Sequence, residues 1–269
     1  MPFTVATWNI NSVRLRVDQV ARFLEEHAPD ALALQEIKCR DEQFPAAELR
    51  KRGYEHIAIY GNKGYHGVAI VARHPFKSVT RHHFCAKEDG RAISVEFESG
   101  PMAGIELADF YVPAGGDIPD PEVNERFAHK LQFLDEFAPW SERFNGPGKR
   151  SILVGDLNVA PLEHDVWSHK QLLNVVSHTP IEVEKFGHVA QAGQWHDVMR
   201  AFVPSEQKLY TWWSYRAAEW RASNRGRRLD HVFASPALAG SWQHMSVLDA
   251  VRDWVRPSDH VPVMVRFEH

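Results

Sequence analysis

The sequence predicts an α/β fold built from many strands. Short apolar runs bounded by turn residues recur along the chain at Ala31–Glu36, Gly67–Ala72 and Ser151–Asn158. Runs of this kind are typical of buried strands, although periodicity alone does not exclude a helix. Between them lie segments in which apolar residues return at helical spacing, for example around Val20 and Leu24. Alternation of the two patterns indicates the α/β class.

Length and composition predict one globular domain spanning residues 1–269. No internal repeat, low-complexity tract or linker interrupts the chain. Hydrophobic residues make up 44% of the sequence, with nine tryptophans and fifteen phenylalanines, which excludes a disordered chain.

Charge, cysteine content and the N-terminal segment limit the possible partners and location of the protein. The net charge of −4 does not by itself indicate a polyanionic partner, so any affinity for phosphate must come from local clusters or from a metal ion. Cys39 and Cys85 imply no disulfide framework and fit a reducing compartment. No secretion signal or membrane-length apolar run is present. We therefore expect a cytoplasmic protein without a membrane partner, and no obligate protein partner is implied.

Strands and helices alternate through the first half of the chain. An amphipathic helix beginning near Val17 is expected to end before Pro29, and Phe44–Leu49 is a second amphipathic stretch. Strands are expected at Phe3–Asn11, Ala31–Glu36, His56–Tyr60, Gly67–Ala72, Ala92–Phe97 and Gly104–Val112.

The second half continues the alternation. A helix marked by Val123, Phe127, Leu131 and Leu134 leads through Asn145–Gly148 into the next strand. Further elements are expected as a strand at Ser151–Asn158, a mixture of short helices and loops over Pro161–Gly193, a helix at Trp195–Phe202, and strands at Leu229–Ala234 and Val261–Phe267.

Polar residues stand where several of these strands end. Asp156 and Asn158 share parity, so they project from one face if the chain stays extended, and an ordinary Asx turn is the alternative. A rigid sheet that brings such ends together can form a shared site. The other residues in this position are Asn9, Glu36, Tyr111, Asp230 and the pair Asp259–His260. Taken singly, each has a structural alternative, such as a hydrogen-bonded histidine or a half-buried strand tyrosine.

The chemistry of these side chains suits Mg²⁺ or Mn²⁺, which prefer a few carboxylates together with water and substrate phosphate. A metal beside a histidine and a carboxylate base would serve phosphodiester hydrolysis. No P-loop is present, and the two cysteines cannot form a structural zinc site. The oxygen ligands on offer are Glu36, Asp156, Asp230, Asp259, Asn9 and Asn158.

Six motifs occur in the order found in the exonuclease III family of AP endonucleases, within the endonuclease/exonuclease/phosphatase superfamily. The chain resembles this family from Thr7 to Pro262, and the resemblance implies a four-layer α/β sandwich of two mixed sheets packed face to face with helices outside. The motifs are Trp8–Asn11, Gln35–Lys38, Tyr111–Pro113, Gly155–Asn158, Arg228–His231 and Ser258–Pro262.

The resemblance also implies roles for the residues at the strand ends. Glu36 resembles the principal metal ligand, with Asn9 and Asp259 nearby in the metal and water network. Asp156 matches the residue that aligns or activates the attacking water, and Asn158 matches the one that orients it or contacts the phosphate.

Three further residues resemble phosphate-contacting groups. Tyr111 corresponds to a tyrosine whose phenol contacts the phosphate, and Asp230 with His260 resembles a paired Asp–His beside the scissile phosphate. Whether Asp156 or His260 acts as the general base stays open, because coupled groups near a metal do not titrate independently.

An aromatic and arginine-rich patch supplies the candidate substrate contacts. Trp212 matches the aromatic that walls the family's pocket for an extruded abasic sugar. The loop that follows is rich in arginine, and a basic loop beside aromatics suits a groove that tracks phosphates. A solvated charged loop is the alternative. The candidates are Arg216, Arg225 and Arg227, flanked by Arg221 and Arg228, with Asn11, Arg14 and Lys38 as further backbone contacts.

Three positions depart from the family pattern. Ala114 stands where many members carry Asn or Gln, which implies the loss of one contact to phosphate. His231 occupies a place often held by an aromatic or aliphatic residue. Arg227 stands where some members have a pocket-lining tryptophan. The segment His164–His178 is unassigned, and the offset of His164 and His169 favours surface positions over a zinc site.

The predicted function is a Mg²⁺-dependent DNA repair phosphodiesterase that incises double-stranded DNA 5′ to abasic sites. The resemblance also implies 3′→5′ exonuclease activity and cleaning of blocked 3′ ends. One alternative is a phosphoesterase of the same superfamily that acts on an inositol phosphate or a phospholipid head group. Another is a non-catalytic nucleic-acid-binding module, against which the full set of metal and water-activating residues argues.

Overall fold

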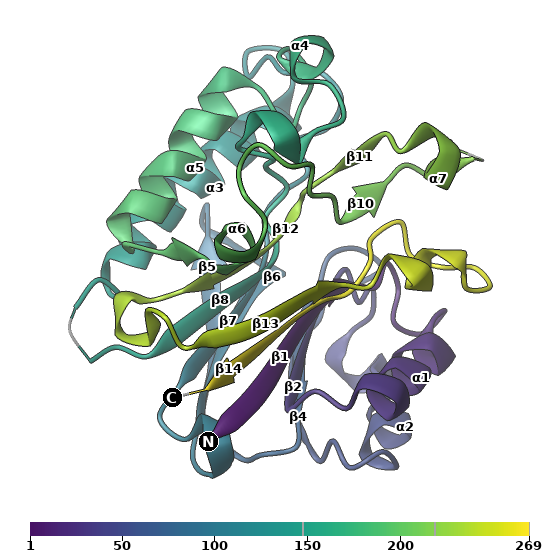
Figure 1. Ribbon diagram of the computed structural model, residues 1–269, viewed down its shortest axis with the longest axis vertical. Helices are drawn as coiled ribbons and strands as arrows, with labels where there is room; N and C mark the ends of the chain where they lie inside the picture. Colours follow the sequence, from purple (N-terminus) through teal and green to yellow (C-terminus); the bar gives the residue numbers. More distant parts are fainter. Residues whose placement is uncertain (147, 218, 269) are drawn as a thin grey trace.

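Two mixed six-stranded sheets packed face to face form the centre of the molecule (Figure 1). The computed structural model describes residues 1–146, 148–217 and 219–268. In spatial order the first sheet contains β13 (Trp242–Val247), β14 (Val263–Glu268), β1 (Pro2–Asn9), β2 (Ala31–Gln35), β4 (Val68–Ala72) and β3 (His56–Tyr60). The second contains β5 (Phe76–Phe84), β6 (Lys87–Phe97), β7 (Glu106–Tyr111), β8 (Ser151–Asp156), β12 (Asp230–Ala234) and β9 (His196–Asp197). Strand β1 runs parallel to β2 and β7 parallel to β8, whereas the other neighbours are antiparallel.

Helices cover the outer faces of both sheets, as Figure 1 shows. The first sheet is covered by α1 (Val17–His27) and α2 (Ala46–Arg50), and the second by α3 (Glu125–Glu142) and α5 (Pro180–Ala192). The remaining elements are α4 (His169–Leu172), α6 (Val198–Phe202), α7 (Trp220–Ser223) and a small hairpin of β10 (Trp212–Trp213) and β11 (Gly226–Arg227). The four-layer α/β sandwich implied by the resemblance is therefore confirmed.

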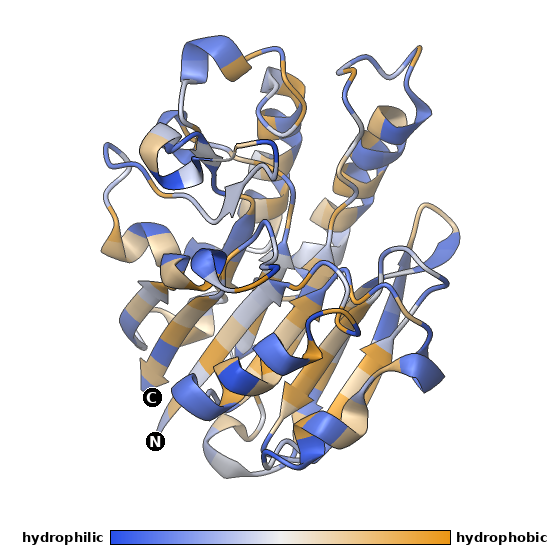
Figure 2. Ribbon diagram, turned by 90° about the vertical axis from the view of Figure 1, so that its right-hand side faces the viewer, coloured by the Kyte–Doolittle hydropathy of each residue, from blue (hydrophilic) through white to orange (hydrophobic). Residues whose placement is uncertain are grey.

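Alternation along the strands builds the layers. Val5, Leu107 and Val154 belong to the apolar core between the sheets, whereas Leu32 packs with the residues of α1 on the outer face of the first sheet. On the outer face of the second sheet, Phe110 stacks on a helix phenylalanine with a centroid separation of 4.4 Å. In Figure 2 the strands are mostly coloured as hydrophobic, and the helix in front of them carries hydrophilic residues. Strands β2, β4, β8 and β12 thus bury both faces, which is why their runs in the sequence are almost continuously apolar.

The first helix follows the sequence prediction. Its apolar stripe of Val20, Phe23 and Leu24 is buried, and the helix ends at a left-handed Ala28 whose amide donates to the Leu24 carbonyl, just before Pro29. Helix α3 begins later than expected, because Asn124 caps it, so Val123 lies outside the helix and is 70% exposed.

Two of the longer strands were not expected from the sequence. Strands β5 and β13 both lie at the edge of a sheet, and most of the residues of β5 are exposed and polar. An edge strand needs little apolar surface, so it lacks the signal that marks a buried strand.

Two further expectations were partly wrong. The helix expected from Trp195 begins only at Val198, because His196–Asp197 pairs with β12 and the Asp197 side chain accepts a hydrogen bond from the Arg200 amide. The first strand ends at Asn9 and not at Asn11, whose φ of 47° takes it out of the sheet.

A buried polar layer joins the two sheets beneath the strand ends. Gln35 Nε2 in β2 donates to Thr7 Oγ1 in β1 at 2.9 Å and to Asp109 Oδ1 in β7 at 2.7 Å. All three residues are fully buried, and burial raises the pKa of Asp109 well above its ordinary range. Hydrogen bonds across an apolar interface favour one register of the two sheets, because a slip would leave these groups unpaired.

None of the helices in the described ranges is long and apolar enough to cross a bilayer. Cys39 and Cys85 are both buried and free. The cytoplasmic location stays a prediction.

Replacement of Gly155 by alanine is expected to destabilise the fold. Gly155 in β8 has a φ of 137°, and a Cβ there would lie 2.0 Å from the carbonyl oxygen of Phe110 in the neighbouring strand. We expect Gly155→Ala to lower the free energy of unfolding by more than about 2 kcal/mol. The control is Gly187→Ala on the exposed face of α5, where a Cβ meets nothing within 4 Å and should add up to about 1 kcal/mol. Urea unfolding compares the two, and equal stabilities would contradict the prediction.

Candidate active site

The predicted site residues meet where the core between the sheets ends. In the second sheet, Asp156 at the end of β8 stands opposite Tyr111 on one side and Asp230 on the other. Side chains alternate between the two faces of a strand, and these three residues lie on the face that packs against the first sheet, as Val154 of β8 does. Asn9 ends β1 in the first sheet with the parity of Val5. The grouping predicted from strand ends is therefore present in the structure.

Asn9 joins two carboxylates that come from different sheets. Its Nδ2 donates to Glu36 Oε1 at 2.9 Å and to Asp156 Oδ2 at 2.8 Å. Its Oδ1 accepts from the Asn11 amide at 3.0 Å, which fixes the orientation of the carboxamide. The Asn9 side chain is fully buried, so it acts as a rigid link between Glu36 and Asp156.

Glu36 reaches this link because the chain turns sharply after β2. Its parity matches Leu32 and Leu34, which pack on the helix side of the sheet, but a φ of 49° at Glu36 redirects the side chain. Burial opposes ionisation of Glu36, yet the Lys38 ammonium at 2.8 Å and the Asn9 hydrogen bond outweigh it and hold its pKa below the usual range. Glu36 is therefore a carboxylate at neutral pH.

His260 is held by a buried carboxylate on one side and faces another. Its Nδ1 lies 2.8 Å from Asp230 Oδ2, and Asp230 in turn accepts from Thr211 Oγ1 at 2.6 Å. The Nε2 of His260 points to Asp156 Oδ2 at 3.6 Å. Burial favours the neutral imidazole, but the charges of Asp230 and Asp156 outweigh it and raise the pKa of His260 well above its ordinary value. His260 is thus a cation at neutral pH.

Burial and neighbouring charges also shift the pKa of Asp156. Burial raises its pKa, the His260 cation lowers it, and the charges of Asp230 and Glu36 raise it again, so the net pKa of Asp156 lies well above the range of an exposed aspartate. A carboxyl with this environment has a high affinity for a proton. It is the site residue best suited to accept one near neutral pH.

Asn158 follows Asp156 in a left-handed turn. With a φ of 52°, it donates its amide to Asp156 Oδ1 at 3.1 Å and its Nδ2 to the Val112 carbonyl at 2.9 Å. The chain is therefore not extended from Asp156 to Asn158, as the shared-face expectation required, and the alternative Asx turn is present. Both side chains nevertheless line the same pocket. The turn and the shared site are not alternatives.

Tyr111 keeps its proton. The phenol is buried, and burial together with the charges of Glu36 and Asp156 raises its pKa well above the ordinary value. The Arg91 guanidinium lies 5.1 Å from the ring centroid. Tyr111 can therefore donate a hydrogen bond but does not ionise.

Asp259 ties the aromatic patch to the site. Its Oδ1 accepts from Asn11 Nδ2 at 3.0 Å and its Oδ2 from Trp212 Nε1 at 2.9 Å. Burial opposes ionisation, but the His260 charge and these hydrogen bonds hold the pKa of Asp259 below its usual range. Both Asp259 oxygens are thus engaged, which the sequence could not indicate.

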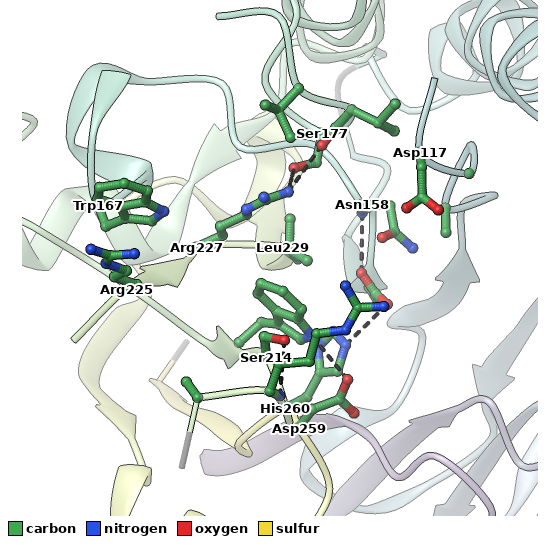
Figure 3. A pocket seen from close by; sticks show the side chains of 18 of the residues that line it. Asp117, Asn158, Trp167, Ser177, Ser214, Arg225, Arg227, Leu229, Asp259 and His260 are labelled. Atoms are coloured by element: carbon green, nitrogen blue, oxygen red, sulfur yellow. Dashed lines mark hydrogen bonds and ion pairs between the residues drawn. The ribbon is translucent and has the colours of Figure 1, made fainter. Parts of the chain in front are cut away.

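One cavity of about 980 Å³ opens onto these residues (Figure 3). In Figure 3, Trp167 and Arg225 lie together on one side, Asn158 and Asp117 on the other, and Arg227 points toward Ser177 between them. Asn9 and Asp230 are buried and are not among the residues that line the cavity. The predicted site residues that line the cavity are Glu36, Tyr111, Asp156, Asn158, Trp212, Arg216, Arg225, Arg227, Asp259 and His260.

Three residues predicted to contact the DNA backbone lie outside the cavity lining. The Lys38 ammonium is bound to Glu36 and to Asn11 Oδ1 at 2.6 Å, and Asn11 bridges to Asp259. Arg14 is exposed in the turn after Ser12. Lys38 and Asn11 thus support the carboxylates of the site.

The arginine-rich stretch is not one free basic loop. Arg228 is fully buried, with Nε 2.8 Å from Asp165 and Nη1 2.6 Å from Asp197. Arg221 is paired with Asp253 at 2.6 Å on the surface. The expectation of a continuous phosphate-tracking loop is therefore wrong at these two positions. Among the described residues of this stretch, Arg216 and Arg225 are exposed beside the cavity.

Side chains at the heart of the site can hold a metal ion. Ligand atoms of Glu36, Asp156 and His260 lie within 4.8 Å of one another. Because His260 is protonated, the two carboxylates are the donors that it leaves for a cation. Two carboxylates share one amide in a buried place, and their like charges contribute to the raised pKa of Asp156, so a bound cation would relieve their repulsion. The donors fit a hard divalent cation. Asp259, which was expected near the metal, accepts hydrogen bonds from Asn11 and Trp212, and its metal role stays a prediction.

Comparison with known proteins agrees with this geometry. A family model described as the Endonuclease/Exonuclease/phosphatase family matches residues 6–260. Exodeoxyribonuclease III of Haemophilus influenzae is 28% identical over 97% of this chain and 98% of its own. The solved structure of an AP endonuclease from Archaeoglobus fulgidus superposes with a TM-score of 0.90 at 30% identity, over 99% of this chain and 100% of that one. The 3′-5′ exonuclease NExo from Neisseria meningitidis gives 0.89 at 30% identity, with the same coverage.

The chain belongs to the endonuclease/exonuclease/phosphatase family. The resemblance to its exonuclease III members is thereby confirmed, and the chain is an enzyme of the exodeoxyribonuclease III and AP endonuclease type.

Sequence reasoning missed a buried ion pair behind the site of this endonuclease/exonuclease/phosphatase protein. Lys130 of α3 is paired with Glu182 of α5, and both are fully buried. Lys130 Nζ also donates to the Asn158 carbonyl at 2.7 Å, and Glu182 accepts from the Ser177 amide at 2.9 Å. The pair thus braces the turn after β8 against the cavity wall. Thr179 and Glu182 form a capping box, a signal that the sequence does contain.

Two unassigned histidines have structural roles. His231 is fully buried, with Nε2 2.8 Å from the Val159 carbonyl, and its ring packs against Phe186. His169 lies with Nδ1 2.8 Å from His178 Nε2, so it contacts that residue and is only partly exposed.

Stability is expected to fall at acid pH through His231. Burial and the nearby Arg228 charge lower its pKa from 6.5 to about 4, so the folded protein keeps the ring neutral. The stabilisation is complete above pH 6.5 and is lost as the pH falls toward 4, because the unfolded chain takes up the proton first. The loss is about 2 kcal/mol by pH 5.

His231→Phe removes this linkage. Chemical unfolding between pH 7.5 and pH 5 should give a shallower loss for His231→Phe than for the wild type. The control is His188→Ala, because His188 is exposed on the surface of α5. Identical slopes for wild type and His231→Phe would contradict the assignment.

Proposed function

We propose that this protein is a Mg²⁺-dependent DNA repair phosphodiesterase that incises double-stranded DNA 5′ to abasic sites. We include 3′→5′ exonuclease activity and the removal of blocked 3′ ends in the proposal, with Mn²⁺ as an alternative ion. The main support is the pair of hydrogen bonds by which Asn9 holds Glu36 and Asp156 together beside His260. These residues adjoin a cavity that is also lined by Trp212.

Support for a DNA substrate comes from the named relatives. The curated relatives of H. influenzae and Dictyostelium discoideum bear the names exodeoxyribonuclease III and DNA-(apurinic or apyrimidinic site) endonuclease. A 3′ phosphatase from Neisseria, 29% identical with a TM-score of 0.89, has been solved with a product DNA hairpin. The exposed Arg216 and Arg225 beside the cavity suit a phosphate backbone.

The proposed mechanism divides the work among the side chains. Asp156 accepts the proton of the attacking water, because its pKa is raised, and Asn158 orients that water. His260 stays protonated, so it neutralises a phosphate oxygen instead of acting as the base. A divalent ion at Glu36, with Asn9 and Asp259 near it, would supply charge neutralisation at the phosphate.

The remaining residues position the substrate. Tyr111 donates a hydrogen bond from its neutral phenol to the phosphate, and Asp230 holds His260 through Nδ1. Trp212 packs against a sugar without a base, whose extrusion costs less stacking energy than that of an intact nucleotide. Since both sheets supply these groups, we infer that residues 1–269 act as one catalytic domain.

Replacement of Asp156, the proposed general base, is the first test. Asp156→Asn should lower the turnover of a duplex with a tetrahydrofuran abasic analogue on the order of 10³-fold, while binding of the duplex is retained. A chelator should abolish wild-type incision, and added Mg²⁺ should restore it. The control Asp18→Asn lies on the exposed face of α1. If the wild type left this duplex intact and hydrolysed a soluble inositol phosphate, the superfamily alternative would replace the proposal.

Salt dependence of binding is the second test. Arg216→Ala and Arg225→Ala should each reduce the slope of log K against log salt by about 1, because each removes one phosphate contact. Arg221→Ala is the matched control, since its guanidinium is already paired with Asp253. Titrations with the abasic duplex in the Asp156→Asn background keep the DNA intact. Equal slopes for all three variants would argue against a DNA groove at this place.

A further inference from the structure

Arg227 stands in the wall of the cavity beside the proposed sugar site. It pairs with Trp212 across the β10–β11 hairpin, and its guanidinium lies 5.3 Å from a Trp212 ring centroid. In Figure 3 its side chain runs past Leu229 toward Ser177. A cation thus stands in the cavity wall beside Trp212, the residue proposed to pack against the sugar.

The guanidinium is held in place by a chain of hydrogen bonds. Its Nη1 donates to the Val176 carbonyl at 3.0 Å and to Ser177 Oγ at 2.8 Å. The Ser177 amide is fixed in turn by the buried Glu182 at 2.9 Å. Among the described residues, the side-chain hydrogen bonds given for Arg227 both come from Nη1, and its buried Nε has no partner. The side chain is fixed but retains unused donors.

The positive charge of Arg227 is only partly balanced. Burial lowers its pKa and the Glu182 charge opposes this shift, but Glu182 is already paired with the buried Lys130. Two cations therefore share one carboxylate, and an arginine stays protonated in proteins. Asp117 and Glu219 also line the cavity, and both are exposed to solvent. An incoming anion would offset this excess charge within the wall.

We propose that Arg227 makes the cavity selective for groups that carry an oxyanion of their own beyond the scissile phosphate. The inference rests on the proposed function. Two sources share this chemistry: the carboxylate of a 3′-phosphoglycolate end, and the next phosphodiester of an internal abasic site. In the first case water adds to phosphorus, the bond to the DNA O3′ breaks, O3′ takes up a proton, and phosphoglycolate leaves with its carboxylate at Arg227.

A pair of isosteric ends tests the terminal source. Duplexes ending in 3′-phosphoglycolate or in the neutral 3′-phosphoglycolamide differ only in charge. The wild type should prefer the acid by about tenfold in kcat/KM, since a charged hydrogen-bonded pair is lost with the amide. Arg227→Gln should reduce the preference to within about twofold, and Arg227→Lys should keep part of it.

A second pair tests the internal source. A tetrahydrofuran duplex carries either a phosphodiester or an uncharged methylphosphonate on the 3′ side of the abasic residue. If Arg227 contacts that phosphate, the methylphosphonate slows the wild type and not Arg227→Gln. Arg227-dependent selectivity in either pair supports the proposal and identifies the source.

Three results would overturn the proposal. If the wild type showed no preference in both pairs, or if Arg227→Gln slowed the charged and neutral members of both pairs equally, Arg227 would only brace the wall. Hydrolysis of none of the four duplexes would overturn the proposed function as well, so the two failures are distinguishable. Thermal unfolding of Arg227→Gln and Arg227→Lys checks that both variants are folded.

Discussion

The two hydrogen bonds from Asn9 Nδ2 to Glu36 and Asp156 are the contact on which the site depends, because each carboxylate follows a strand of a different sheet. Their separation is therefore set by the packing of the sandwich. The buried link between Gln35 and Asp109 one layer below acts in the same direction. A polar group in an apolar interface favours a single register, because any other leaves it unpaired. The fold thus fixes the distance between the carboxylates before any ligand binds, which is the preorganisation that electrostatic catalysis requires.

Charge at the site is balanced unevenly, and the imbalance supports the proposed roles of the side chains. Glu36 has the Lys38 ammonium as a partner, so it remains ionised. His260 is bound on its Nδ1 side by Asp230, which keeps the imidazole protonated and turns Nε2 toward Asp156. Asp156 is buried beside Asp230 and Glu36, and burial together with their charges raises its pKa above that of an exposed aspartate. The same side chains thus separate into a permanent anion, a permanent cation and a proton acceptor, as pairs of titratable groups in different environments do.

The sequence predicted the members of the site better than their contacts. Asp156 and Tyr111 could be grouped because strand ends are marked by apolar runs and strands of one sheet bring their ends together. The pairing of Lys130 with Glu182 could not, because helical periodicity places a lysine on a buried stripe without indicating its partner on another helix. Burial of Arg228 was missed for the same reason, since its acidic partners come from distant segments. Edge strands such as β5 lack the apolar signal altogether. Local pattern therefore specifies the elements, whereas ion pairs between elements depend on the tertiary fold.

That buried pair also connects the chemistry to the cavity wall. Lys130 holds the Asn158 carbonyl in its left-handed turn, and Glu182 holds the Ser177 amide, whose hydroxyl in turn positions Arg227. A shift of α3 relative to α5 would consequently move the turn at Asn158 and the wall at Arg227 together. Because a buried ion pair loses much more when one partner is removed than it contributes as a whole, this brace tolerates little change. The reactivity proposed for Asp156 and the selectivity proposed for Arg227 therefore share one rigid support.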